Sequence, residues 1–303
     1  MRRQAKICLL LTAGSLAAVM GGCAAIPEAS VPSQVGVAAS PLEPTPRPTA
    51  TPTEVHPTDL AQELPALQIT YICNDGFSIS TSGKRILVDA LFNDIDKICP
   101  ANLEVAAPAA ADALGGAHLV LVSHSHWDHF DPHVVGSYLL ANPDSVLIAE
   151  HSAAEALAAE FENFPDIQDR VHGLELDRGQ ATQMSVSGIE VEVISAPADV
   201  PNLGFVVQVG GSTFLHSGDS GYDSAMAADF RALALADRDI DLAFLPYWYF
   251  IDPSGESMVA EVPARYYVPM HYAGEQLSAV FPGLKSLYPR AILFRSSLET
   301  WPP

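Results

Sequence analysis

The sequence predicts an α/β fold with two mixed β-sheets packed against each other and helices on their outer faces. Two observations support this fold class. Apolar segments of strand length recur from about residue 67 onward, and segments of helical character separate the later ones. Because a sheet buries one face against another layer, strands interleaved with helices fit two sheets with helices outside. Residues 66–303 are long enough for one large domain.

The predicted elements follow the chain in a regular order. Turn sequences separate the first three strands, and an apolar run precedes a polar, histidine-rich loop. Strands are predicted at residues 67–73, 77–81, 85–89, 117–123, 146–149, 171–176, 189–194, 204–209, 213–216, 242–246 and 291–294, with one more ending at His271. Helices are predicted at residues 103–114, 134–141, 153–162, 223–236, 257–262 and 275–287.

The most informative stretch is His124-Ser125-His126-Trp127-Asp128-His129, directly after the strand at residues 117–123. In extended backbone, side chains two residues apart point the same way, so His124 and His126 can share one metal ion. Asp128 and His129 follow a turn and face a second position. Imidazole nitrogen and carboxylate oxygen are usual ligands for zinc and similar ions. Unrelated surface histidines are the alternative, but they do not explain this clustering after a strand.

The stretch resembles the signature of the metallo-β-lactamase-fold hydrolases. Three more segments resemble motifs of that family in the family's order: Ile86-Leu87-Val88-Asp89, Phe214-Leu215-His216-Ser217-Gly218-Asp219 and Val268-Pro269-Met270-His271-Tyr272. The last has the form common in the lactonase-like and phosphodiesterase-like branch. The resemblance runs from about Leu67 to the end of the sequence. It implies an αββα sandwich with metal ligands on loops along one edge, and it says little about substrate.

The resemblance also implies two divalent metal ions, zinc first, with manganese or iron as alternatives. The expected ligands are His124 and His126 at the first position, Asp128, His129 and His271 at the second, and Asp219 bridging both. Asp128 is the expected catalytic residue, because it could also steer the attacking hydroxide. His216 is expected to pack or to orient a ligand.

The sequence departs from the family pattern at the third ligand of the first position, which is normally a histidine. The matching stretch, Val193 to Phe205, contains none, and Asp199 is the nearest replacement. As a ligand, Asp199 would add a third carboxylate, weaken the first metal as a Lewis acid and favour manganese or iron. The alternative is that Asp199 only caps a loop.

The N-terminal residues predict export. Residues 1–22 have a basic leader, an apolar core and small residues before Cys23, and so resemble a bacterial lipoprotein signal peptide. Cys23 would carry the lipid that anchors the protein to the cell envelope; an ordinary secretory peptide is the alternative. Residues 23–65 are rich in proline and threonine and predict an extended tether. Residues 66–303 would then form the hydrolase domain.

The charge restricts the partners. Loss of residues 1–22 removes three basic residues and no acid, which takes the formal charge from −21 to −24. This surface disfavours a nucleic-acid partner and electrostatic adhesion to anionic lipid. A neutral or amphiphilic small-molecule substrate fits it better, and membrane attachment would come from acyl chains on Cys23. The sequence gives no indication of oligomeric state.

The cysteines and aromatic residues leave alternatives open. In an exported domain, Cys73 and Cys99 either form a disulfide or remain two buried thiols, and neither has the spacing of a metal site. The run Pro246-Tyr247-Trp248-Tyr249-Phe250, with Trp127 and Phe130, lines a substrate pocket or packs in the core.

The expected function is hydrolysis of an ester, lactone or phosphodiester by metal-activated water outside the cytoplasm. The missing third histidine motivates the alternative, a lipoprotein that binds metal or a ligand and has lost turnover. A β-lactamase proper is a third and weaker option, because that branch lacks the Pro-Met-His-Tyr ending.

Overall fold

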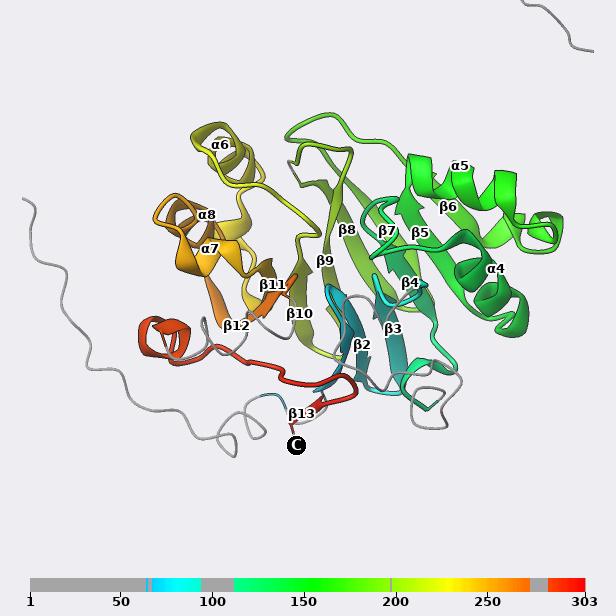
Figure 1. Cartoon of the computed structure of the whole chain (residues 1–303), viewed down its shortest axis with the longest axis horizontal. Helices are drawn as coiled ribbons and strands as arrows, with labels where there is room; N and C mark the ends of the chain where they lie inside the picture. The colour runs from blue at the N-terminus through cyan, green and yellow to red at the C-terminus, as the bar shows by residue number, and fades with distance from the viewer. Residues whose placement is uncertain (1–63, 65–66, 94–111, 197, 273–282, 303) are drawn as a thin grey trace, which may run out of the picture. The chain divides into compact units, whose positions relative to one another are not determined.

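The computed structural model in Figure 1 describes residue 64 and residues 67–93, 112–196, 198–272 and 283–302. The chain divides into two compact units, Met1–Ala50 and Thr51–Pro303, and every described residue belongs to the second. The predicted signal peptide, nearly all of the tether, and Cys99 therefore lie outside the described residues. Within these residues, no helix has the length and apolar character needed to span a membrane.

The first sheet contains seven strands in the order β13-β1-β2-β3-β4-β5-β6. The strands from β3 to β6 pair in parallel, whereas β13, β1, β2 and β3 pair antiparallel. Their bounds are β1 (Leu67–Cys73), β2 (Gly76–Thr81), β3 (Lys84–Val88), β4 (Leu119–Val122), β5 (Val146–Glu150), β6 (Val171–Leu174) and β13 (Thr300–Trp301).

The second sheet contains six strands in the order β12-β11-β10-β9-β8-β7. Strands β10, β11 and β12 pair in parallel, and the strands from β7 to β10 pair antiparallel. Their bounds are β7 (Ala181–Val186), β8 (Ile189–Ser195), β9 (Leu203–Val209), β10 (Ser212–His216), β11 (Ile240–Pro246) and β12 (Ala264–Met270). Both sheets are mixed, as predicted.

Helices cover the outer face of each sheet (Figure 1). On the first sheet lie α4 (Pro132–Ala141) and α5 (His151–Glu160); on the second lie α6 (Ser224–Ala232), α7 (Trp248–Ile251) and α8 (Glu256–Glu261). Short 3₁₀ turns occupy Phe164–Asp166, Gln168–Arg170 and Leu235–Asp237.

The buried side chains explain the layers. On β3, Ile86 and Val88 belong to the cluster between the sheets, whereas Leu87 faces the cluster under α4 and α5. On β11, Phe244 faces the cluster between the sheets and Leu245 the one under the second set of helices. Side chains alternate along a strand, so a sheet buried on both faces needs such continuous apolar runs. The predicted αββα fold is confirmed.

Some predicted elements are wrong or incomplete. The structure adds β7, β13 and α7, which were not predicted. Residues 291–294 form no strand; Ala291 makes only an isolated bridge with Tyr267, and Phe294 instead stacks on Tyr71 with ring centroids 5.6 Å apart. The predicted helices at residues 103–114 and 275–287 fall mainly outside the described residues.

Candidate metal centre

The candidate site is built from loops that leave one edge of the sandwich. The histidine-rich loop follows β4, Asp219 lies three residues after β10, and His271 directly follows β12. The turn between β1 and β2 adds Asp75. Parallel strands present their carboxyl ends on the same edge, so residues distant in sequence converge here.

Two groups of side chains have ligand atoms within 4.8 Å of one another: His124, His126 and Asp219, and Asp75, His129, Asp219 and His271. Asp219 belongs to both. Its Oδ2 lies 3.7 Å from His124 Nε2 and 3.1 Å from His271 Nε2, and its Oδ1 lies 3.4 Å from His129 Nε2. This carboxylate therefore stands between the two groups.

Hydrogen bonds orient the two buried histidines. Asp89 Oδ2 lies 3.0 Å from His129 Nδ1, so His129 Nε2 is turned toward Asp219. Asp89 also accepts hydrogen bonds from the backbone N–H of Ser123 at 2.8 Å and from its hydroxyl at 2.6 Å. Ser123 Oγ lies 3.0 Å from His124 Nδ1, which leaves His124 Nε2 facing Asp219. Partners of this kind fix the tautomer and ring orientation of metal-binding histidines.

Asp128 lies at the edge of the second group. Its Oδ2 is 3.8 Å from both His129 Nε2 and His271 Nε2, and it accepts a hydrogen bond from Asn74 Nδ2 at 3.1 Å. Each residue predicted as a ligand, except Asp199, thus has a possible ligand atom within 4.8 Å of that of at least one other.

Several polar atoms of the site have no hydrogen-bond partner in the described structure. They are His124 Nε2, His129 Nε2, Asp219 Oδ1 and both carboxyl oxygens of Asp75, and all are buried. A buried polar atom without a partner typically costs about 1–3 kcal/mol. A divalent cation bound by imidazole nitrogen and carboxylate oxygen would remove that cost, so these residues fit a metal ion.

The pKa values reflect the crowding of charges. Burial, followed by the neighbouring His129, lowers the pKa of His124 to about 3, which keeps this ring neutral as a metal ligand must be. Burial opposes ionisation of Asp219, but the neighbouring imidazoles of His129 and His271 hold its pKa below the usual range. Burial also opposes the charge on His129, yet the neighbouring Asp219 carboxylate and the bond to Asp89 raise its pKa well above normal. A metal ion at His129 Nε2 would displace that proton.

Three of the seven described non-glycine residues with positive φ lie at the same place. Asn74, Asp89 and His271 have φ angles of 54°, 44° and 60°, in the left-handed region that residues other than glycine rarely adopt. Such conformations cost about 1–3 kcal/mol each and occur preferentially at functional sites. Here each one turns the chain at the end of a strand so that polar groups meet between the sheets.

The structure does not bring Asp199 into either group. Asp199 is exposed and lines a cavity of about 300 Å³ together with Glu150, Leu176 and Asn202. Asn202 holds the loop of the candidate bridging residue: its Oδ1 accepts from Asp219 N at 3.2 Å, and its Nδ2 donates to Ser217 O at 3.0 Å. The described residues therefore offer two histidines and Asp219 to the first position.

Two residues of the site were not predicted as ligands. Asp75 was interpreted only as part of a turn. His216 is completely buried; its Nε2 donates to Asp75 O at 3.0 Å, and its Nδ1 accepts from Gly218 N at 3.2 Å. It therefore links the β1–β2 turn to the loop that carries Asp219.

The aromatic residues, predicted either to line a substrate pocket or to pack in the core, do not all have the same role. Tyr249, Phe250 and Phe130 are buried and belong to core clusters. Trp248 is partly buried against one of these clusters and also flanks the site: its ring centroid lies 4.9 Å from that of His271, and its Nε1 donates to Ser220 O at 3.2 Å. Core packing thus accounts for most of the run, and Trp248 forms one wall beside His271.

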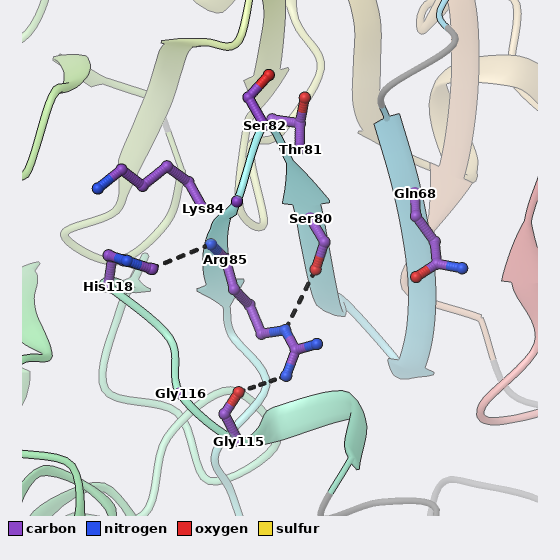
Figure 2. Close-up of a pocket in the computed structure, with 10 residues that line it drawn as sticks. Gln68, Ser80, Thr81, Ser82, Lys84, Arg85, Gly115, Gly116 and His118 are labelled. Atoms are coloured by element: carbon purple, nitrogen blue, oxygen red, sulfur yellow. Dashed lines mark hydrogen bonds between the residues drawn. The ribbon is translucent and has the colours of Figure 1, made fainter.

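Another cavity, of about 470 Å³, lies near the starts of β3 and β4, away from the strand ends that carry the site (Figure 2). Arg85 donates there to Ser80 Oγ at 3.2 Å and to the carbonyl oxygen of Gly115. Its backbone N–H donates to His118 Nδ1 at 3.3 Å. These bonds hold the loop before β4, and neither metal-binding group includes a residue of this cavity.

The sandwich and its cluster of buried histidines and carboxylates define a class: metal-dependent hydrolases of the metallo-β-lactamase fold. Residues 84–272 match the family model described as the Beta-lactamase superfamily domain, and the chain belongs to that family. The matched residues extend from β3 to the residue after His271, so they include every predicted ligand.

Individual proteins are similar to this chain in sequence or in fold. A UPF0173 metal-dependent hydrolase of Nitratidesulfovibrio vulgaris is 28% identical over 217 residues, which cover 68% of this chain and 80% of the relative. An iron-sulfur protein of Mycolicibacterium smegmatis, named as a Rieske 2Fe-2S protein, is 28% identical over 211 residues; these cover 66% of this chain and only 37% of that protein. Igni18, a metallo hydrolase of Ignicoccus hospitalis, has a similar fold, with a TM-score of 0.51 and 16% identity over 78% of this chain and 97% of its own.

Proposed function

We propose that this protein hydrolyses an ester, lactone or phosphodiester bond in a neutral or amphiphilic small molecule. The observation that carries the proposal is the convergence of buried imidazole and carboxylate atoms without hydrogen-bond partners on Asp219, from the loop after β4 and from the β1–β2 turn. Metal ions held there would supply a water of lowered pKa and stabilise the oxyanion that forms.

The proposed ligands follow the two groups. His124 and His126 hold the first ion, Asp128, His129 and His271 hold the second, and Asp219 touches both. Zinc suits the histidines, and manganese or iron suits the carboxylates. Asp89 and Ser123 keep the rings of His129 and His124 aimed at Asp219. Asp128 orients the attacking water, since its carboxylate faces the site while Asn74 fixes one of its oxygens.

The proposed location is the outside of the cell membrane, reached by a lipoprotein signal peptide and held by a lipid on Cys23. Cys73 is disulfide-bonded, which supports an oxidising compartment; its predicted partner Cys99 lies outside the described residues. The acidic chain supports a small-molecule substrate and argues against a nucleic acid.

A second candidate function is a metal-binding lipoprotein without turnover. The position of Asp199 favours it, because the first position then has only two histidines and a shared carboxylate among the described residues. A catalytic metal nevertheless keeps a coordination place open for water, so an incomplete ligand set is also what hydrolysis requires.

Metal analysis combined with a panel of ester, lactone and phosphodiester assays tests both functions. The panel compares the wild type with Asp219→Ala and with Asp144→Ala, a change of an exposed aspartate outside both groups. We expect bound metal and turnover on one substrate class, both lost in Asp219→Ala and both kept in Asp144→Ala. Bound metal with no turnover on any substrate would support the binding protein instead.

A further inference from the structure

Asp75 is a completely buried acidic group of the site whose carboxyl group makes no hydrogen bond in the described structure. It lies in the turn Asn74-Asp75-Gly76 between β1 and β2 and has no exposed surface. Neither of its carboxyl oxygens has a hydrogen-bond partner. A structural carboxylate in such a turn normally accepts bonds from nearby backbone N–H groups, and the carboxyl oxygens of Asp75 accept none.

The surroundings of Asp75 make its position unfavourable without a cation. Asp219 and Asp89 are acidic neighbours of this completely buried carboxyl group. The nearest cationic candidate is His129, whose Nδ1 lies 3.8 Å from Asp75 Oδ2 but is already bonded to Asp89 at 3.0 Å. Buried charges are expensive unless they are paired or bind a metal.

The backbone holds the carboxyl of Asp75 at this place. His216 Nε2 donates to Asp75 O at 3.0 Å, and His271 N donates to Asn74 O at 3.3 Å. A Cβ on Gly76 would lie 2.8 Å from the carbonyl oxygens of Asp89 and Cys73, so the turn has little freedom to move. Fixed in this way, Asp75 offers a ligand atom within 4.8 Å of those of His129, Asp219 and His271.

We propose that Asp75 is a further ligand of the second metal ion, beyond the residues that the family resemblance assigns. The proposal rests on the proposed function, since it concerns the same site. With Asp75, the second position has three carboxylates, Asp75, Asp128 and Asp219, and two imidazoles. The first position keeps two imidazoles and shares one carboxylate. The two positions therefore differ in preference: zinc at the first, and an oxygen-preferring ion such as manganese at the second.

The test separates metal binding from folding. Asp75→Asn keeps the size of the side chain and removes its charge, and Asp144→Asn is the matched control at an exposed site. We measure the dissociation constants of manganese and zinc by calorimetry, and the melting temperature of each variant after chelation. For Asp75→Asn we expect about 10–100-fold weaker binding of the second ion, with the first unchanged. After chelation we expect a melting temperature that is higher by about 2–4 °C, because the substitution removes an acidic group buried beside Asp219 and Asp89. Asp144→Asn should change neither quantity.

The opposite pattern would overturn the proposal: unchanged affinity for both ions together with a lower melting temperature of the chelated variant. A wild type that binds no metal would instead refute the proposed function. A crystal structure of the zinc-loaded wild type decides the question even if Asp75→Asn does not fold. We expect an Asp75 oxygen about 2.0–2.2 Å from an ion, and an ion held by His129 and His271 without contact to Asp75 would exclude the role.

Discussion

The two proposed metal positions differ in how the chain encloses them. The second is surrounded by the β1–β2 turn and by the loops after β4, β10 and β12, and its members Asp75 and His129 are completely buried. The first depends on one loop and on Asp219, and one of its two histidines, His126, is exposed. Among the described residues, the first has fewer ligands and lies closer to solvent.

This difference indicates that the two proposed metal positions have different roles. A closed set of ligands anchors an ion, whereas an open one leaves a place for water or substrate, as catalytic zinc sites do. The second position would therefore fix Asp219 and the geometry of the site. The first would present the reacting water, next to the loop where the family usually supplies a histidine.

The largest effect is expected from Asp219→Ala, because this carboxylate belongs to both positions. We expect both ions to be lost and activity to fall by more than the about 10–100-fold that changes around a metal site typically cost. Elemental analysis and turnover measure this, with Asp144→Ala as the control. Retention of one full equivalent of metal would show that the positions do not depend on Asp219.

Single-position changes come next. His271→Ala should remove the second ion and, with it, the support of Asp219, whose Oδ2 lies 3.1 Å from His271 Nε2. His126→Ala should remove only the first ion and leave the second at full occupancy. Both should reduce kcat by roughly 100-fold or more, and metal content distinguishes them. Equal loss of both ions in both variants would contradict two separable positions.

The fold could be predicted to this extent because burial leaves a clear pattern in the strands. Strand β4 is a continuous apolar run, and β3, β10 and β11 each contain a shorter buried apolar run: Ile86–Val88, Phe214–Leu215 and Leu242–Leu245. The missed strand β7, Ala181–Val186, is half-exposed and half of its residues are polar, so it has no continuous apolar run. The segment 291–294 has strand-like residues, but Phe294 packs on Tyr71 instead of pairing.

The site residues that belong to a local sequence motif could be predicted. Those that join the site only through the folding of the chain could not. The six-residue stretch at His124 signals metal binding on its own. Asp75 did not, because Asn-Asp-Gly is also an ordinary turn, and its partner Asp219 is 144 residues away. The one available signal was a carboxylate in a short turn between two predicted strands, where burial is costly without a cation.

A smaller effect is expected from Asn202→Ala. Asn202 accepts from Asp219 N and donates to Ala196 O and Ser217 O, so its loss removes two hydrogen bonds that hold the loop of Asp219. We expect about 10-fold weaker metal binding and a loss of about 1–3 kcal/mol in the free energy of unfolding. Asn142→Ala is the control. The side chain of Asn142 also bonds only to backbone, at Gly116 and Tyr138, and these residues belong to neither metal-binding group. The Asn142→Ala variant should lose stability but keep its metal affinity. Equal metal affinities in the two variants would disprove the positioning role of Asn202.

The smallest effect is expected from Asp199→Ala, and it decides how open the first position is. Asp199 is exposed and belongs to neither metal-binding group, so its removal should change metal content and kcat/KM by less than about 2-fold, as is usual for exposed residues. Loss of the first ion would instead make Asp199 the replacement for the family's histidine. Asp199→His tests the same point from the other side. If this variant binds only the first ion more tightly and lowers kcat, then water normally binds at the coordination place that the third imidazole has filled.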